Sequence, residues 1–302
     1  MSSRFTALIL GLILAAGCLP LAAQTYSLQP FSYPHLTGQS LYPQAINNRG
    51  AVVGYIQYFD TTLNMSVNRA FKRDANGALE QPFEDPKGFW TVATGINDLG
   101  VMTGYYINPD YYHRHGFLLY KGVFTDFFLK PPGRHTEILG VNNRGDFVGT
   151  FPGTQGKGNH GFVSVNGVVT QFDYPRADGI VPHGIAADGT IVGSAYYANG
   201  AHKATWGFLR GPAGRYMKIT IPGASRTEVL GINTAAHKVV GCYDYGHGFV
   251  YDYVTGTITN VEWPDPNTSY TVITGINSSG VIVEWARVNG QGGAFGFIGT
   301  PQ

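Results

Sequence analysis

The chain has 302 residues, of which 14% are aromatic, 13% are charged and 42 are glycine. The aromatic content excludes a disordered chain, and the glycines are typical of a sheet protein with many tight turns. Without Arg4 in the N-terminal segment, 19 basic residues balance 19 acidic ones. A formally neutral chain has no electrostatic footprint for nucleic acid and no polybasic segment for anionic lipid. We therefore expect no nucleic-acid partner.

The N-terminus has the three-part pattern of a secretory signal peptide. Arg4 precedes an apolar run over residues 5–16, and small residues lead to Ala23. This run is too short for a comfortable membrane span. We predict a signal peptide over residues 1–23 and a secreted or periplasmic protein without a transmembrane segment. The alternative is a lipid anchor on Cys18, which follows a loose lipoprotein-processing motif.

A short segment recurs six times along the remaining chain, with 44 to 50 residues between successive starts. Each copy matches the pattern Gly-Ile-Asn-x-x-Gly with at most one substitution, and between two β-rich runs this pattern predicts a tight turn. The Asn bonds its own backbone, and the Gly adopts the positive φ that the turn requires. The copies span residues 45–50, 95–100, 140–145, 184–189, 231–236 and 275–280.

Each copy leads into an apolar strand that usually ends in Gly. A second motif of the His-Gly-Phe kind and a last strand follow, which gives four short strands per repeat. Four strands in about 45 residues is the signature of a propeller blade. We predict an all-β, six-bladed β-propeller forming one domain over residues 24–302. Its blades span residues 41–83, 90–130, 136–174, 180–221, 227–263 and 270–299.

The two ends of the chain predict how the ring closes. The sixth repeat stops after residues 294–299 and lacks its fourth strand. Residues 24–34 supply an unattached strand that would complete this last blade and remove an open sheet edge. A linear β-solenoid is the alternative, and it would not need such a complementary split.

The repeats resemble the probable extracellular repeats of the HAF family, named for a His-Ala-Phe motif near the end of each repeat. That motif stands here as Arg69-Ala70-Phe71 and as three His-Gly-Phe copies. The phrases over residues 132–137 and 222–228 are also similar to that family. The resemblance covers the chain after the signal peptide and implies export from a bacterium. It implies no activity or ligand.

Several recurring side chains are interpreted as structural. His115, His160 and His247 recur at one repeat position, but other repeats place Arg, Trp or Phe there. We expect each His to bond a neighbouring backbone group, and we predict no metal site. Cys242 is expected to be a small core residue. The turn Asn residues are expected to form turns, with the lining of an axial channel as the alternative.

The segments that differ between blades are the best candidates for a ligand site. In a propeller, the loops between second and third strands share a face with the connections between blades. Function is often carried by variable loops on a rigid scaffold, and aromatic side chains with polar tips suit sugar rings or peptides. The candidate ligand-binding residues are Tyr58, Asp60, Trp90, Tyr111, Tyr112, His113, Arg114, Arg134, His135, Tyr197, Arg226 and Tyr245.

The sequence contains no nucleophile elbow, zinc-protease motif, phosphate loop or calcium loop. The equivalent acids Glu137 and Glu228 follow similar phrases and are interpreted as members of structural ion pairs. The favoured hypothesis is a non-catalytic binding module without a cofactor, for a glycan or a cell-surface protein. The alternatives are a carbohydrate-active hydrolase or lyase, with acids, His or Arg converging in the central funnel, and a structural envelope protein. The oligomeric state is left open.

Overall fold

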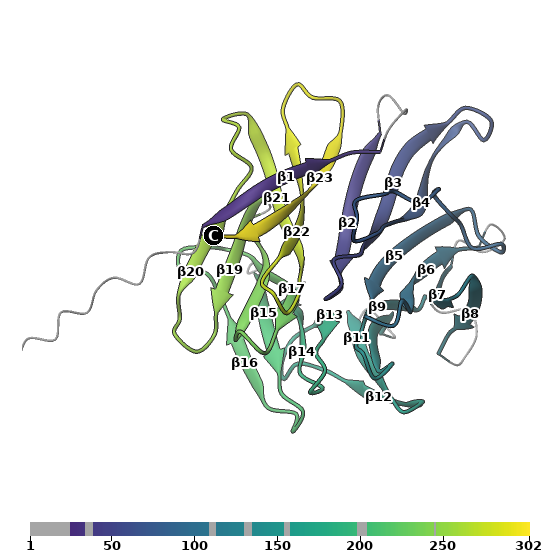
Figure 1. The fold of residues 1–302 in the computed structure, drawn as a ribbon. Helices are drawn as coiled ribbons and strands as arrows, with labels where there is room; N and C mark the ends of the chain where they lie inside the picture. The colour runs from purple at the N-terminus through teal and green to yellow at the C-terminus, as the bar shows by residue number, and fades with distance from the viewer. Residues whose placement is uncertain are drawn as a thin grey trace, which may run out of the picture.

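The computed structural model describes residues 25–33, 39–108, 113–129, 135–153, 158–197, 204–244 and 246–302. Over these ranges the chain forms strands without a helix, in six antiparallel sheets arranged around an axis (Figure 1). The predicted six-bladed β-propeller is confirmed. No helix long and apolar enough to cross a membrane occurs in these ranges. The predicted signal peptide and Cys18 lie outside them.

Blades 1 to 3 follow one another along the chain, each with its first strand nearest the axis (Figure 1). Blade 1 contains β2 (Ser40–Ile46), β3 (Val52–Asp60) and β4 (Met65–Arg73). Blade 2 contains β5 (Trp90–Ile96), β6 (Met102–Ile107), β7 (Arg114–Tyr120) and β8 (Val123–Phe127). Blade 3 contains β9 (Glu137–Val141), β10 (Phe147–Pro152), β11 (Asn159–Val165) and β12 (Val168–Phe172).

Blades 4 and 5 repeat the same order, and blade 6 is built from both ends of the chain. Blade 4 contains β13 (Gly179–Ile185), β14 (Ile191–Tyr197), β15 (Ala204–Arg210) and β16 (Tyr216–Ile219). Blade 5 contains β17 (Thr227–Asn233), β18 (Lys238–Tyr243), β19 (His247–Asp252) and β20 (Ile258–Val261). Blade 6 contains β21 (Thr268–Ile276), β22 (Ile282–Val288), β23 (Ala294–Pro301) and the N-terminal β1 (Tyr26–Phe31).

The ring closes as predicted, because β1 is the outer strand of blade 6. It pairs antiparallel with β23, from Tyr26 opposite Pro301 to Phe31 opposite Gly296. The first and last strands of the described chain therefore lie side by side in one sheet (Figure 1). This pairing rules out the linear solenoid.

Blade 1 departs from the prediction of four strands, because its sheet has three. The fourth strand is reduced to isolated bridges, in which Phe83 pairs with Ala70 and Leu79 pairs with Arg73. Pro82 and Pro86 flank Phe83 in the sequence. Proline lacks the N–H that a strand ladder needs, which explains why the pairing does not extend.

The first strand of every blade carries a β-bulge at the same repeat position. After the bulge, glycine backbones of neighbouring blades approach one another around the axis. A Cβ on Gly140 would lie 3.0 Å from the Cα of Gly184, and one on Gly231 would lie 3.1 Å from the Cα of Gly275. The Gly of the Gly-Ile-Asn motif therefore allows the blades to meet at the axis.

The Phe of the second motif forms the framework of each blade. All six of these rings are fully buried, at positions 71, 117, 162, 208, 249 and 297. In blades 1 to 5 each ring covers a strand-two glycine; a Cβ on Gly54, for example, would lie 2.8 Å from the Phe71 ring. Blade 6 carries Glu284 in place of that glycine. Its side chain is buried, and neither carboxyl oxygen has a hydrogen-bond partner among the described residues.

Candidate functional site

The turn Asn at the end of each first strand forms two kinds of hydrogen bond. In blade 1, Oδ1 of Asn47 accepts from the backbone N–H of Arg49 at 3.1 Å and of Ala51 at 2.9 Å. These bonds confirm the turn interpretation. In addition, Nδ2 of Asn47 donates to the backbone carbonyl of Asn97 in the next blade, at 3.1 Å. This inter-blade bond was missed from the sequence, which pointed only to a local turn.

The inter-blade bond recurs around the axis and is interrupted once. Ala186 of blade 4 accepts such a bond but has no side-chain amide to donate the next one. Four of the five turn Asn residues, all except Asn277, also line a pocket on the axis, so the channel-lining alternative holds for them together with the turn interpretation. Besides the bond of Asn47, four side-chain amides donate to a backbone carbonyl of the next blade: Asn97 to Asn142, Asn142 to Ala186, Asn233 to Asn277 and Asn277 to Asn47, at 3.0, 3.1, 2.8 and 3.3 Å.

The next residue of each turn forms a second set of contacts, which we call the rim. The backbone N–H of Ser278 donates to Asn48, that of Asn48 to Asp98, and that of Asp98 to Asn143, each to a side-chain oxygen at 2.8 Å. Blades 4 and 5 place Ala187 and Thr234 at this position. The rim is therefore hydrogen-bonded from blade 6 through blades 1, 2 and 3, and it lacks these side-chain bonds over blades 4 and 5.

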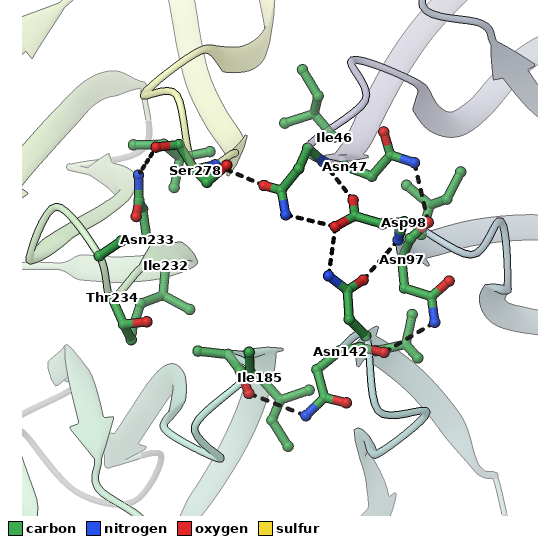
Figure 2. A pocket seen from close by; sticks show the side chains of 18 residues that line it. Ile46, Asn47, Asn97, Asp98, Asn142, Ile185, Ile232, Asn233, Thr234 and Ser278 are labelled. Atoms are coloured by element: carbon green, nitrogen blue, oxygen red, sulfur yellow. Dashed lines mark hydrogen bonds between the residues drawn. The ribbon is translucent and has the colours of Figure 1, made fainter.

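A cavity of about 250 Å³ lies inside this rim on the propeller axis (Figure 2). Figure 2 shows Asp98 on one side of the opening and Thr234 and Ile185 on the other. Burial disfavours the ionised form of Asp98, but hydrogen bonds from Asn48 and Asn143 outweigh it and lower its pKa. The inner wall is apolar and contains one residue from each blade: Ile46, Ile96, Val141, Ile185, Ile232 and Ile276.

The predicted variable face lies at the other end of the first strands. Contacts between second-to-third-strand loops and blade connections confirm that these segments share it. In one, the Trp90 indole N–H donates to the Ser66 carbonyl at 2.9 Å. In another, the Arg114 backbone N–H donates to His135 Nδ1 at 3.2 Å. Four of the predicted ligand-binding residues lie outside the described residues: Tyr111, Tyr112, Arg134 and Tyr245.

The first group of candidates lies where blade 1 meets blade 2. Arg69 lies 3.9 Å from Asp60, 3.4 Å from Glu84 and 5.7 Å from the centre of the Tyr58 ring. Because Arg69 lies between them, Tyr58 and Asp60 are tied to a local ion-pair network. Trp90 lies beside the same hairpin.

The second group lies where blade 2 meets blade 3. The His113 and His135 rings are 5.1 Å apart, and Arg114 forms an ion pair with Glu137. The Arg114 guanidinium also lies 5.1 Å from the centre of the Tyr105 ring. The pKa of His135 is lowered mainly by burial, and the nearby His113 and Arg114 lower it further. The predicted residues His113, Arg114 and His135 are thus brought together. Asp60 is not part of this group, because it pairs with Arg69 where blade 1 meets blade 2.

The third group lies where blade 4 meets blade 5 and includes a pocket of about 340 Å³, which we call the junction pocket. Tyr197 and Arg226, both predicted, contribute to its lining. Arg226 pairs with Glu228 at 2.5 Å. Sequence reasoning did not name the other seven lining residues as ligand-binding. The junction pocket is lined by Val181, Ser194, Tyr196, Tyr197, Ala204, Thr205, Ser225, Arg226 and Glu228.

The size of one side chain explains why a pocket opens at this junction. The residue after the strand-two glycine is aromatic in blades 1 and 2, and Trp285 follows Glu284 in blade 6. In blade 1 this residue is Tyr55, whose ring centre lies 4.9 Å from that of Tyr42. The Tyr42 ring centre in turn lies 5.2 Å from that of Trp285. Blades 3, 4 and 5 carry the small residues Thr150, Ser194 and Cys242 at this position. Alignment of this single position between repeats would have narrowed the search for a pocket to blades 3, 4 and 5.

The equivalent acids Glu137 and Glu228 are both ion-paired, as their repeat positions predicted. The second oxygen of Glu228 lies 3.6 Å from the Cys242 sulfur. Burial, together with the nearby Glu228 carboxylate, raises the pKa of Cys242 to about 12, so its thiol stays protonated at neutral pH. Cys242 is buried, in agreement with its interpretation as a core residue. Neither group is available as a nucleophile or general base in this arrangement.

The motif histidines differ in one respect from the expectation. His160 bonds the Asp173 carboxylate at 2.8 Å, and His247 bonds the Glu262 carboxylate at 2.7 Å. The predicted backbone partner is therefore wrong for both, because an acid after the outer strand lies within reach of the ring. His115 stacks on Tyr106 with 5.2 Å between ring centres. Within the described ranges, no three His, Cys, Asp or Glu residues cluster as a metal site.

No protein-family model and no curated protein matches the chain. Among solved structures, it is similar to a structural-genomics target named as a candidate gluconolactonase. The identity is 14% over 92% of this chain and 93% of the other, with a TM-score of 0.50. A fungal alcohol oxidase in complex with copper has 9% identity over 92% and 76% of the two chains and a TM-score of 0.47. At 14% identity, the likeness to the first of these structures shows a shared fold alone.

Proposed function

We propose that this protein is an exported, non-catalytic binding module that holds a glycan in the junction pocket between blades 4 and 5. The observation that carries the proposal is the pocket itself. It lies on the predicted variable face, has a volume of about 340 Å³ and combines aromatic, hydroxyl and charged side chains. Ligand sites in proteins are concave, with a few placed polar groups on a largely preformed surface.

The aromatic side chains of the pocket suit the apolar face of a sugar ring. Tyr197 is 40% exposed, and its ring centre lies 4.8 Å from that of buried Trp206. The contact with Trp206 fixes one side of the Tyr197 ring, and the other side is open to a ligand. Because the ring is already held in place, it loses little rotational freedom when a ligand binds. Stacking on such a ring and hydrogen bonds to its polar edge are how proteins hold molecules with one apolar face.

The polar side chains of the pocket are fixed before any ligand arrives. Ser225 donates to Asp244 at 2.7 Å, and Arg226 is held by Glu228 at 2.5 Å. Prearranged donors and acceptors bind with a smaller loss of entropy than free ones. The same fixation supports a non-catalytic role, because both oxygens of Glu228 are engaged by Arg226 and Cys242. A glycosidase requires a second, free carboxyl group about 5–10 Å away.

The proposal also includes export from a bacterium and membership of the HAF-repeat family. Support for both comes from the sequence alone, namely the signal-peptide pattern and the motif around Phe71 with its five counterparts. The structure adds a physical role for that motif, since its Phe is the buried framework residue of every blade.

A glycan array probed with the purified protein tests the function, followed by thermal-shift titration of each hit. A ligand that binds the folded state raises the melting temperature as its concentration rises. Ser194→Tyr places in blade 4 the residue type of Tyr55 and Tyr105 and should abolish the shift by filling the pocket. Ser194→Thr is the matched control and should retain it.

Either a hit that survives Ser194→Tyr or an array without hits would contradict the glycan site. A cell-surface protein partner or an envelope role would then account better for this face. Incubation of each hit with the protein, with product analysis, tests the non-catalytic part separately. Accumulation of a cleaved glycan would establish the hydrolase or lyase alternative.

A further inference from the structure

The axial cavity on the opposite face has unused hydrogen-bonding groups where its rim is interrupted. In the continuous part, the backbone N–H groups of Ser278, Asn48 and Asp98 each donate to a side chain of the next blade. The equivalent N–H groups of Asn143 and Ala187 meet no acceptor among the described residues, because the next blades carry Ala187 and Thr234 there. Two neighbouring donors are thus left for solvent or a ligand.

The turns show that the N–H groups of Asn143 and Ala187 point in the same direction as the equivalent N–H group of Asn48 in blade 1. In blade 1, the N–H of Gly50 bonds the carbonyl of residue 47 at 3.1 Å. In blade 3, Gly145 bonds residue 142 at 3.1 Å, and in blade 4, Gly189 bonds residue 186 at 3.0 Å. Because the backbone closes each turn in the same way, the Asn143 and Ala187 N–H groups face the rim as that of Asn48 does.

Asp98, in the blade before Asn143, offers an acceptor on the same rim. Oδ2 of Asp98 accepts from the amide groups of Asn48 at 2.7 Å and Asn143 at 2.5 Å, whereas Oδ1 accepts from the Asn48 backbone alone. A carboxylate oxygen has two lone pairs, so Oδ1 can accept one further hydrogen bond. The cavity therefore combines two donors, one anionic acceptor and an apolar inner wall.

This combination selects among small molecules by charge and hydrogen bonding. An anion would satisfy the two N–H groups but would be repelled by Asp98, and a cation would meet the N–H groups with the wrong polarity. A hydroxyl group both accepts and donates, so neighbouring hydroxyls on one molecule satisfy both kinds of group. The C–H face of a sugar ring or polyol also fits against Ile185 and the other apolar residues of the inner wall.

We propose that the axial cavity is a second ligand site, which binds one neutral polyhydroxylated molecule of monosaccharide size between the Asn143 and Ala187 N–H groups and Asp98. A volume of about 250 Å³ suits a molecule smaller than the ligands of typical pockets. The site is independent of the junction pocket, since the two share no lining residue. It therefore stands or falls separately from the proposed function.

Amide NMR of the ¹⁵N-labelled protein, titrated with glucose, myo-inositol and glycerol, tests the site. At least one of these probes should shift the Asn143 and Ala187 signals with a millimolar Kd. Ala187→Asn supplies the acceptor found in blades 1 and 3 and should raise that Kd at least tenfold. Ser194→Tyr, on the other face, should leave it within twofold of the original value.

Three outcomes would overturn the site. The first is an absence of shifts at both amides with all three probes, which means that the cavity holds water alone. The second is an Ala187→Asn variant that binds like the original protein. The third is sodium acetate shifting the same amides as strongly as the polyols, which would mean an adventitious anion site.

Discussion

The sector of blades 6, 1 and 2 and the sector of blades 4 and 5 share one backbone plan but differ at both ends of the axis. In the first sector, Asn48 and Asp98 continue the rim, and large rings such as Tyr55 fill the variable face. In the second, Ala187 and Ser194 stand at the equivalent positions; the rim of the axial cavity is interrupted there, and the junction pocket opens on the other face. Two short side chains per blade thus separate a sector with a continuous rim and a filled face from one in which both are open.

The comparison also shows which parts of the repeat are independent of that choice. Phe71 in the first sector and Phe208 in the second are both fully buried against a glycine of the neighbouring strand. Loss of a ligand-facing side chain therefore leaves the blade framework intact. The following predictions test this separation, in order of decreasing effect.

The framework should be equally sensitive in the two sectors. Phe71→Ala and Phe208→Ala each leave a large cavity in a packed blade, and each should reduce the free energy of unfolding by about 3–5 kcal/mol. Urea denaturation followed by tryptophan fluorescence measures both. A Phe208 variant that loses much less than the Phe71 variant would show that the open sector is also loosely packed, which would break the comparison.

The turn Asn should be the next most important position. Asn97 accepts from two backbone N–H groups with Oδ1, at 3.0 and 2.9 Å, and donates to the Asn142 carbonyl at 3.0 Å. Asn97→Ala removes three hydrogen bonds and should cost about 2–3 kcal/mol of unfolding free energy, since each is worth about 1 kcal/mol net. The same denaturation experiment measures it.

Exposed Asn76, in a loop of blade 1, supplies the control, and its replacement by Ala should change stability by less than about 0.5 kcal/mol. A loss as small for Asn97→Ala would mean that the ring of inter-blade bonds does not stabilise the propeller.

Much of this arrangement was predictable because it repeats. Asn and Gly each recur in five of the six turns and so located them, and the missing last strand located the closure through β1. The junction pocket depends on what is absent, namely a large side chain at Ser194, and absence is visible only when repeats are aligned position by position. The inter-blade role of Asn47 could not be predicted from the sequence, because its partner lies 50 residues away and is a backbone carbonyl.

Blade 6 contains a buried acid that should make the closed sector sensitive to pH. Burial raises the pKa of Glu284. Tyr26, on the closing strand, interacts with this acid, and burial together with Glu284 raises the pKa of Tyr26 to about 12. Because the folded state holds the Glu284 proton more tightly, its contribution to stability is complete below the unfolded pKa of about 4.3. It declines as the pH rises toward and through the folded pKa, by up to about 1.4 kcal/mol per pH unit.

Glu284→Gln cannot ionise and should therefore gain stability relative to the original protein as the pH rises from 5 to 9. Urea denaturation at several pH values measures the difference. Stability curves that run parallel across this range would show that Glu284 is already ionised when folded, with a partner supplied by solvent.

The smallest expected effect would convert the open sector toward the closed one. Ala186→Asn introduces in blade 4 the turn residue of the other five blades, whose Oδ1 bonds the turn and whose Nδ2 reaches the next blade. In the original turn, Asp188 already accepts from the Thr190 N–H at 2.8 Å, so only part of the gain is new. We therefore expect an increase of about 1 kcal/mol in unfolding free energy. Ala186→Ser, which lacks the reach to blade 5, should give no increase. If both variants leave the unfolding free energy unchanged, the missing Asn at blade 4 costs the protein no stability. The two sectors would then differ only in side-chain volume.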